Sequence, residues 1–216
     1  MKKKFLAGLA IGVMMLGLAG VASANLITNG SFENGSPVPT GNFNTLTANT
    51  ASADDITGWT VTSGTIDWIN SYWQASDGTK SLDLAGFSHG TIVGVNFATI
   101  IGQTYLVQFD MAGNPDTSND KIMVGASVGT TQHTFTFDQN GQTHNNMGWL
   151  TQSFTFVATS ISSSLTFGDV TPYSQYWGAV LDNVRVDAAP VPEPVTMLLM
   201  GTGLVGLVGA RRKKKA

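Results

Sequence analysis

Apolar and polar residues alternate along many short segments in the middle of this chain, and this alternation limits the folds open to it. In the segment 104–111, Tyr105, Val107, Phe109 and Met111 take every second position and would share one face of a strand. The alternation recurs at 134–137, 153–156, 164–167 and 184–186. No segment of the middle region keeps a helical period over several turns. The region is therefore expected to form half-buried strands.

Turn residues divide these strands from one another. Asp77-Gly78, Asn114-Pro115 and Asn140-Gly141 are turn-forming pairs between apolar segments. Further strands are expected at 58–62, 65–69, 81–84, 91–97 and 121–128. The stretch Gly35–Ala53 is low in bulky apolar residues and is expected to be a long loop. About ten short strands with polar turns predict one all-β domain over 25–188, an antiparallel β-sandwich.

The first 24 residues have the pattern of a secretory signal peptide. Lys2, Lys3 and Lys4 precede an apolar run from 5 to 21, and Ala22-Ser23-Ala24 supplies small residues for cleavage. The exported chain is expected to begin at Asn25. An uncleaved N-terminal anchor is the weaker alternative, because the cleavage site is good.

The other end of the chain combines a proline-containing motif that disfavours helix, an apolar segment and a basic tail. Pro192-Glu193-Pro194 stands in a linker over 189–194, an uncharged segment of 16 residues spans 195–210, and the tail 211–216 carries five cations. As a helix, the apolar segment covers about 24 Å of a ~30 Å hydrocarbon core, and snorkelling of flanking cations can cover the rest. The basic tail is expected on the cytoplasmic side of the inner membrane. An ordinary anchor that is never cut has the same pattern.

The order and spacing of Pro192, Glu193 and Pro194, the Gly-rich apolar segment and the basic end resemble the PEP-CTERM sorting signal. The resemblance implies recognition by an exosortase, a membrane enzyme of bacteria that make exopolysaccharide. The protein would then be held in the inner membrane for a time and later reach the cell surface or the extracellular matrix.

The region between the two ends is strongly acidic. Only Lys80, Lys121 and Arg185 oppose 13 acidic residues between 25 and 190, a net charge of about −10. Nucleic-acid binding needs a basic footprint and is disfavoured, whereas cation binding is favoured. The chain has no cysteine, which excludes thiol catalysis and Cys-based zinc sites.

Several motifs of the middle region together resemble the choice-of-anchor C domain family over essentially all of 25–188. They are Asn25–Glu33 at the start, Ala179–Val186 at the end, and the internal segments 66–69, 72–78, 81–84, 109–115 and 146–149. More distantly, the Asn29–Glu33 opening and the Leu181–Val184 ending resemble galactose-binding-like jelly rolls, a fold used by many carbohydrate-binding modules. The resemblance implies an antiparallel jelly-roll sandwich whose first and last strands lie close together.

That second resemblance also implies a structural Ca²⁺ site. Glu33 and Asp182 resemble its carboxylate pair. Because Ca²⁺ takes several oxygen ligands, Ser31 and the turn 77–80 would add backbone carbonyls. In the alternative reading, Glu33 caps a turn and Asp182 accepts backbone N–H bonds.

Aromatic residues next to polar ones form the candidate ligand site. Sugar C–H faces stack on aromatic rings while nearby polar groups bind hydroxyls. The alternative is that most of these aromatics fill the core, as is expected of Trp59 and Trp149, and at least one of the adjacent Tyr72 and Trp73 should be core. The candidate glycan-binding residues are Trp68, Tyr72, Trp73, Asp77, Tyr176 and Trp177.

Catalytic motifs are weak in this sequence. His89, His133 and His144 have no metal-protease spacing, and no serine stands in a nucleophile-elbow motif. An acid pair such as Asp67 and Asp83 is the candidate for a glycosidase site. No catalytic residue is therefore assigned, and the expected function is a non-enzymatic β-sandwich that contacts exopolysaccharide. A structural or adhesion protein that binds other proteins, and a glycan-active hydrolase, are the alternatives.

Overall fold

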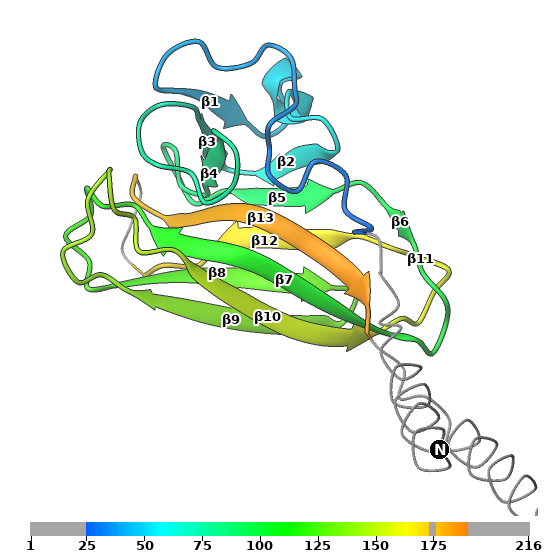
Figure 1. Cartoon of the computed structure of the whole chain (residues 1–216). Helices are drawn as coiled ribbons and strands as arrows, with labels where there is room; N and C mark the ends of the chain where they lie inside the picture. Colours follow the sequence, from blue (N-terminus) through cyan, green and yellow to red (C-terminus); the bar gives the residue numbers. More distant parts are fainter. Residues whose placement is uncertain (1–24, 173–175, 190–216) are drawn as a thin grey trace, which may run out of the picture. The chain divides into compact units, whose positions relative to one another are not determined.

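The computed structural model describes residues 25–172 and 176–189 (Figure 1). The predicted signal peptide, most of the linker, the apolar segment 195–210 and the basic tail lie outside these residues. Within the described ranges, none of the helices is long and apolar enough to span a membrane.

Two antiparallel sheets make up the domain, as the alternation predicts (Figure 1). The larger sheet has six strands in the order β1 (Phe43–Thr47), β3 (Thr65–Ile69), β4 (Ser81–Asp83), β13 (Ala179–Ala188), β7 (Thr104–Gly113) and β10 (Leu150–Val157). The other sheet has five, in the order β2 (Trp59–Ser63), β5 (Thr91–Gly94), β12 (Leu165–Asp169), β8 (Lys121–Val128) and β9 (Thr131–Asp138). The short strands β6 (Phe97–Ala98) and β11 (Ser162–Ser163) form a separate pair.

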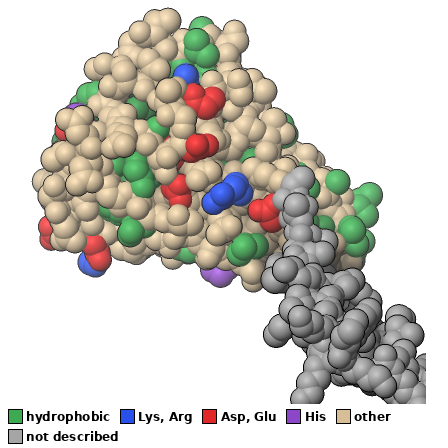
Figure 2. Space-filling view, in the orientation of Figure 1, with side chains coloured by type: hydrophobic (Ala, Val, Ile, Leu, Met, Phe, Trp, Pro, Cys, Tyr) green, Lys and Arg blue, Asp and Glu red, His purple; other side chains and the backbone are tan. Residues whose placement is uncertain are grey.

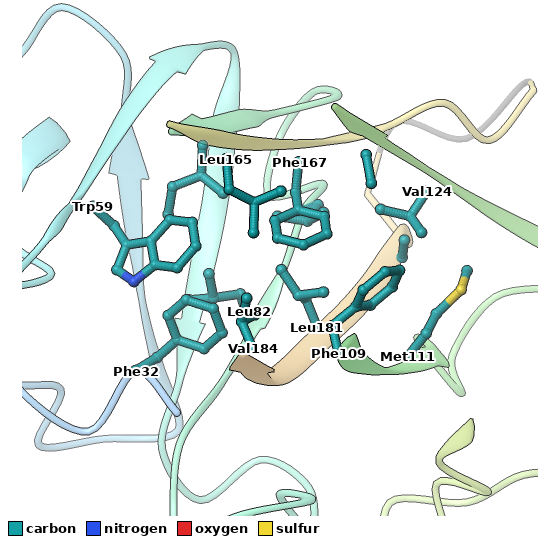
Figure 3. Close-up of a cluster of buried hydrophobic side chains, with 14 of the residues drawn as sticks. Phe32, Trp59, Leu82, Phe109, Met111, Val124, Leu165, Phe167, Leu181 and Val184 are labelled. Carbon is teal, nitrogen blue, oxygen red and sulfur yellow. The ribbon is translucent and has the colours of Figure 1, made fainter. Parts of the chain in front are cut away.

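The core lies between the two large sheets. Figure 3 shows Phe109, Leu181 and Leu82 from the six-stranded sheet beside Phe167 and Leu165 of β12. The Phe109 and Phe167 rings meet edge to face, with centroids 4.9 Å apart. The alternating residues of β7 and β12 therefore face inward, as expected for strands with one buried face.

One sequence prediction about the fold is wrong. The stretch Gly35–Ala53 is not a single loop, because it contains β1 and a 3₁₀ helix over Ala51–Asp54. Strand β1 pairs with β3 in a register that sets Leu46 opposite Ile66. Leu46 is the one buried residue of that strand, so a single inward-facing apolar side chain left little alternation to recognise.

The N-terminal segment lies alongside the last strand, as the galactose-binding-like resemblance implies. The Leu26 N–H donates to the Val186 carbonyl over 2.9 Å, and the Val184 N–H donates to the Gly30 carbonyl over 2.9 Å. A Cβ at Gly30 would lie 2.0 Å from the Val184 carbonyl oxygen, so only glycine fits this approach.

The register of β1, β3 and β4 turns a set of polar side chains to the outer face of the six-stranded sheet. Thr45 lies opposite Asp67, and Asp67 lies opposite Asp83. Because Trp68 and Leu82 point into the core, their neighbours Asp67 and Asp83 must point the other way. This outer face carries the candidate site.

Candidate functional site

A cleft of about 190 Å³ opens on the outer face of β1, β3 and β4. Its wall contains partly exposed aromatic side chains from three separate segments. They are Phe43 (41% exposed), Phe87 (66%), Tyr176 (50%) and Trp177 (40%). Large exposed rings gathered around a cleft are typical of a binding surface, since a folded chain otherwise tends to bury them.

Polar groups lie among these rings. The Thr45 hydroxyl donates to Asp67 Oδ1 over 2.5 Å, and burial raises the pKa of Asp67, an effect that this hydrogen bond opposes. Asp116 accepts from the Tyr72 hydroxyl over 2.7 Å and lies 3.0 Å from His144 Nε2. The hydrogen bond to Asp116 raises the pKa of Tyr72 to about 12. Asp67 and Asp116 therefore offer carboxylate oxygens to a ligand in the cleft.

Asp83 holds the floor of the cleft together. Its Oδ1 accepts from the backbone N–H groups of Ala85 and Gly178, over 2.9 and 3.2 Å, and its Oδ2 accepts from Asn114 Nδ2 over 2.7 Å. Burial raises the pKa of Asp83 well above the usual range. The side chain thus joins β4, the segment after β7 and the segment before β13. Asp67 and Asp83 were the candidate glycosidase pair. Because these donors engage both oxygens of Asp83, the structure does not favour a catalytic role for it.

The three histidines do not converge. His89 Nδ1 contacts Asp169 Oδ2, whose side chain is buried. His133 on β9 packs against Phe154 in a tilted arrangement, with ring centroids 4.8 Å apart. Only His144 reaches the cleft wall, where its ring lies 4.5 Å from that of Tyr72.

The structure corrects part of the predicted ligand set. Trp68 is fully buried and its Nε1 donates to the Phe32 carbonyl over 2.9 Å, so it cannot stack on a ligand. Its place on β3 turns it inward, opposite to Asp67. Asp77 does not line the cleft; it accepts a 2.5 Å hydrogen bond from the Ser31 hydroxyl in a neighbouring loop.

The other predicted aromatics do line the cleft. Tyr72, Tyr176 and Trp177 are part of its wall. Trp73 is 5% exposed and donates from Nε1 to the Ser81 hydroxyl over 2.9 Å, so one of the adjacent pair is core, as expected. Trp59 is also buried, as predicted, and Trp149 is half-buried against the core.

Sequence reasoning missed Phe43, Phe87 and Asp116. Phe43 begins an unrecognised strand, Phe87 lies in a loop without a motif, and Asp116 follows the Asn114-Pro115 turn, where a solvated loop was expected. The one available signal was Phe87 itself, since a phenylalanine is usually buried and one in a loop can indicate a binding surface.

The proposed calcium residues have other partners. Glu33 Oε1 accepts from the Thr79 and Lys80 N–H groups over 2.7 and 2.6 Å, and the Lys80 ammonium lies 3.5 Å from Oε2. Asp182 Oδ2 accepts from the Ser76 and Asp77 N–H groups, each over 2.8 Å. N–H donors thus engage both carboxylates, and the Lys80 ammonium lies beside that of Glu33. Among the described residues there is also no cluster of three or more metal-ligating side chains. These contacts are those expected in the alternative, in which both carboxylates hold the 76–80 loop, and the calcium site stays a prediction.

Comparison with known proteins identifies two parts of the chain. Residues 25–187 match the family described as a protein of unknown function, DUF642, which is a galactose-binding-like family. Residues 190–213 match the PEP-CTERM protein-sorting motif, which implies export and sorting to the cell surface. The narrower expectation of a choice-of-anchor C domain stays a prediction.

Among curated proteins, halomucin of Haloquadratum walsbyi is 33% identical over 177 residues, which are 81% of this chain. The chain spans only 2% of the length of halomucin.

Solved structures with some likeness include a TmCBM61 in complex with beta-1,4-galactotriose, at a TM-score of 0.48 and 12% identity, covering 77% of this chain and 100% of that one. A CBM35 from Paenibacillus barcinonensis has a TM-score of 0.44 and 16% identity, covering 68% of this chain and 99% of that one. Both scores are low, so the fold assignment rests on the strands and sheets of this chain.

The match over 25–187 covers the whole β-sandwich and includes the N-terminal segment that pairs with β13. The chain therefore belongs to the DUF642 family and carries a PEP-CTERM sorting motif behind its β-sandwich domain.

Proposed function

We propose that the β-sandwich binds a glycan in the cleft on the outer face of β1, β3 and β4, and that an exosortase delivers it to the cell surface for this purpose. The observation that carries the proposal is the meeting of exposed rings with carboxylate oxygens. Phe43, Phe87 and Trp177 would stack on sugar C–H faces, while Asp67 and Asp116 accept hydrogen bonds from hydroxyl groups.

The cleft is small for a whole ligand and open to solvent. Its volume of about 190 Å³ is below the ~300–1,000 Å³ usual for small-molecule pockets. An extended polysaccharide fits this shape better than an isolated small molecule, because one part of a chain can enter the cleft while neighbouring units rest on the exposed rings.

The charge of the cleft favours neutral sugars. Asp67 and Asp116 belong to its described lining, which includes no lysine or arginine, whereas burial favours the neutral form of Asp83. A uronic acid would meet like charge there, and like charges in a partly desolvated site repel each other. We therefore infer a neutral exopolysaccharide as the ligand.

Binding to a glycan array, followed by calorimetry on the best ligand, tests the proposal. Phe87→Ala and Trp177→Ala should each weaken binding about three- to tenfold, the range expected for loss of one stacking ring. Val170→Ala is the matched control, because Val170 is 47% exposed and lies outside the cleft. Binding that all three variants retain in full would contradict the assigned site.

The alternatives give different results in the same assays. A chain that binds no glycan but is retained on cells through another protein would support the adhesion function. Product formation from a bound glycan, lost in Asp67→Asn, would establish a hydrolase. Mass spectrometry of the C-terminus in cells tests the exosortase step, which predicts a product that lacks the tail.

A further inference from the structure

A second apolar surface lies at the other end of the domain from the cleft. It consists of Ile100 (66% exposed), Ile101 (63%), Val157 (56%) and Ile161 (74%), here named the isoleucine patch. In the orientation of Figure 1, Figure 2 shows hydrophobic side chains on the surface at the end where β6 and β11 lie. These residues belong to the loops next to these two strands and to the end of β10.

Hydrogen bonds hold the patch as one unit. The Thr99 N–H donates to the Ile161 carbonyl over 3.0 Å, and the Gly102 N–H donates to the Ala158 carbonyl over 2.8 Å. Val157 is paired with Thr104 at the start of β7. Hydrogen bonds thus connect the two segments that carry the patch, 95–104 and 157–163, and the four exposed side chains lie on neighbouring parts of the chain.

The patch is uncharged although the domain is strongly acidic. Segments 95–104 and 157–163 contain no Asp, Glu, Lys or Arg, whereas the region 25–190 has a net charge of about −10. An acidic domain is repelled by the anionic surface of a bacterial membrane. The patch segments bring no carboxylate of their own to such a surface, and Asp187 lies opposite Leu106 in the adjoining strands.

The chain leaves the domain beside this patch. The Ala189 N–H donates to the Thr104 carbonyl over 2.9 Å, and Thr104 follows the patch loop directly. Six residues later, at Val195, the uncharged segment of the sorting motif begins. Even fully extended, six residues reach only about 20 Å. While the tail is intact, the patch cannot be far from the lipid into which that segment would insert.

We propose that the isoleucine patch rests on the lipid surface of the inner membrane while the sorting tail is uncut, and thereby points the glycan-binding cleft away from the bilayer. The proposal rests on insertion of the segment 195–210. Thr104 lies at the patch, whereas Asn114, just beyond the other end of β7, lines the cleft. Ten strand residues span about 33 Å, so the cleft would stand clear of the membrane.

The sorting tail allows the isoleucine patch to stay on the membrane although the patch alone binds lipid weakly. Four aliphatic side chains on their own bind membranes only marginally and reversibly, but a second anchor raises their effective concentration at the bilayer. Removal of the tail would lower the apparent affinity for lipid by at least about 100-fold, in line with the lower bound for linked binding events. Cleavage would therefore also release the patch.

Fluorescence of site-specific labels tests the proposal. Since the chain has no cysteine, a single introduced cysteine takes an environment-sensitive dye at one position. The membrane-inserted chain with its tail intact is placed in vesicles of phosphatidylethanolamine and phosphatidylglycerol, some with nitroxide-bearing lipid. The variants are Ile101→Cys and Leu150→Cys; Leu150 is 49% exposed and begins the strand that ends at Val157.

The expected result is a blue-shifted emission at position 101 that lipid-borne nitroxide quenches, and a water-like emission at position 150. Adding Ile161→Ser to the Ile101→Cys chain should reduce the quenching. A water-like signal at both positions, or equal quenching at both, overturns the proposal. A shift at position 101 that appears only after purified exosortase is added would assign the patch to a protein partner and also overturn it. None of these outcomes depends on glycan binding.

Discussion

Asp182 provides a sharp test of how the last strand holds the loop 76–80. Its side chain is fully buried on β13 and accepts N–H bonds from Ser76 and Asp77. Burial raises its pKa from 3.8 to about 7, because the ionised form loses its hydration, and the nearby carboxylate of Asp77 adds to the effect. Asp110, directly opposite in the sheet, is another acid close to it.

A raised carboxyl pKa fixes the sign of the pH dependence. The folded chain holds the Asp182 proton up to about pH 7, whereas the unfolded chain releases it near pH 3.8. The stability that the protonated, buried Asp182 contributes to the folded chain is thus complete below about pH 3.8 and is lost as the pH rises to about 7. A difference of about three pKa units corresponds to about 4 kcal/mol.

Urea unfolding of the wild-type chain and of Asp182→Asn at pH 4 and pH 8 measures this contribution. Asparagine keeps an oxygen for the Ser76 and Asp77 donors but cannot ionise. We expect the free energy of unfolding of wild type, relative to Asp182→Asn, to fall by about 4 kcal/mol from pH 4 to pH 8. If this relative free energy of unfolding does not change with pH, or if it rises from pH 4 to pH 8, the reasoning is refuted. A rise that depends on added Ca²⁺ would support the calcium site instead.

Three further outcomes follow from the same structure. Thermal melts with Ca²⁺ and with EGTA should give the same Tm, because Lys80 and N–H donors occupy the Glu33 carboxylate; a Tm that falls in EGTA would contradict this. Trp68→Ala should destabilise the fold by about 3–5 kcal/mol in urea unfolding, since it empties a fully buried site, and any loss of glycan binding should match the fraction unfolded. Gly64→Ala should cost more than about 1 kcal/mol, because Gly64 has φ +60° and a Cβ there would lie 1.9 Å from the His89 carbonyl oxygen; an unchanged urea midpoint would argue against that turn.

Much of the sheet was predictable because it depends on local alternation. The strands Thr65–Ile69 and Lys121–Val128 have the predicted bounds, and the turn at Gly78 has the positive φ that Asp-Gly pairs favour. Strand β1 was missed, because its pairing with β3 holds it in place and its own sequence shows no clear alternation. A strand with one buried residue looks like a loop until its partner is known.

The candidate site was only half predictable. Tyr176 and Trp177 were found as aromatic residues grouped near the last strand, but Trp68 was assigned to the ligand although it lies in the core. Alternation puts Trp68 on the same face of β3 as Ile66 and on the face opposite to Asp67, which favours a buried Trp68, but the ligand assignment did not use this pattern. The register with β1 and β4 settles which face is buried and brings Asp67 to the cleft.

The linear order of residues was enough to establish the all-β fold and the sorting motif, because alternation, charge and breaker residues act within a few positions of one another. Distant segments had to meet before the cleft, the isoleucine patch or the roles of Glu33 and Asp182 could be recognised. Residues 43, 87, 116 and 177 share one wall only because the antiparallel sheet and its loops bring them there. Such contacts depend on strand order and register, which are set by burial over the whole domain rather than by any one segment.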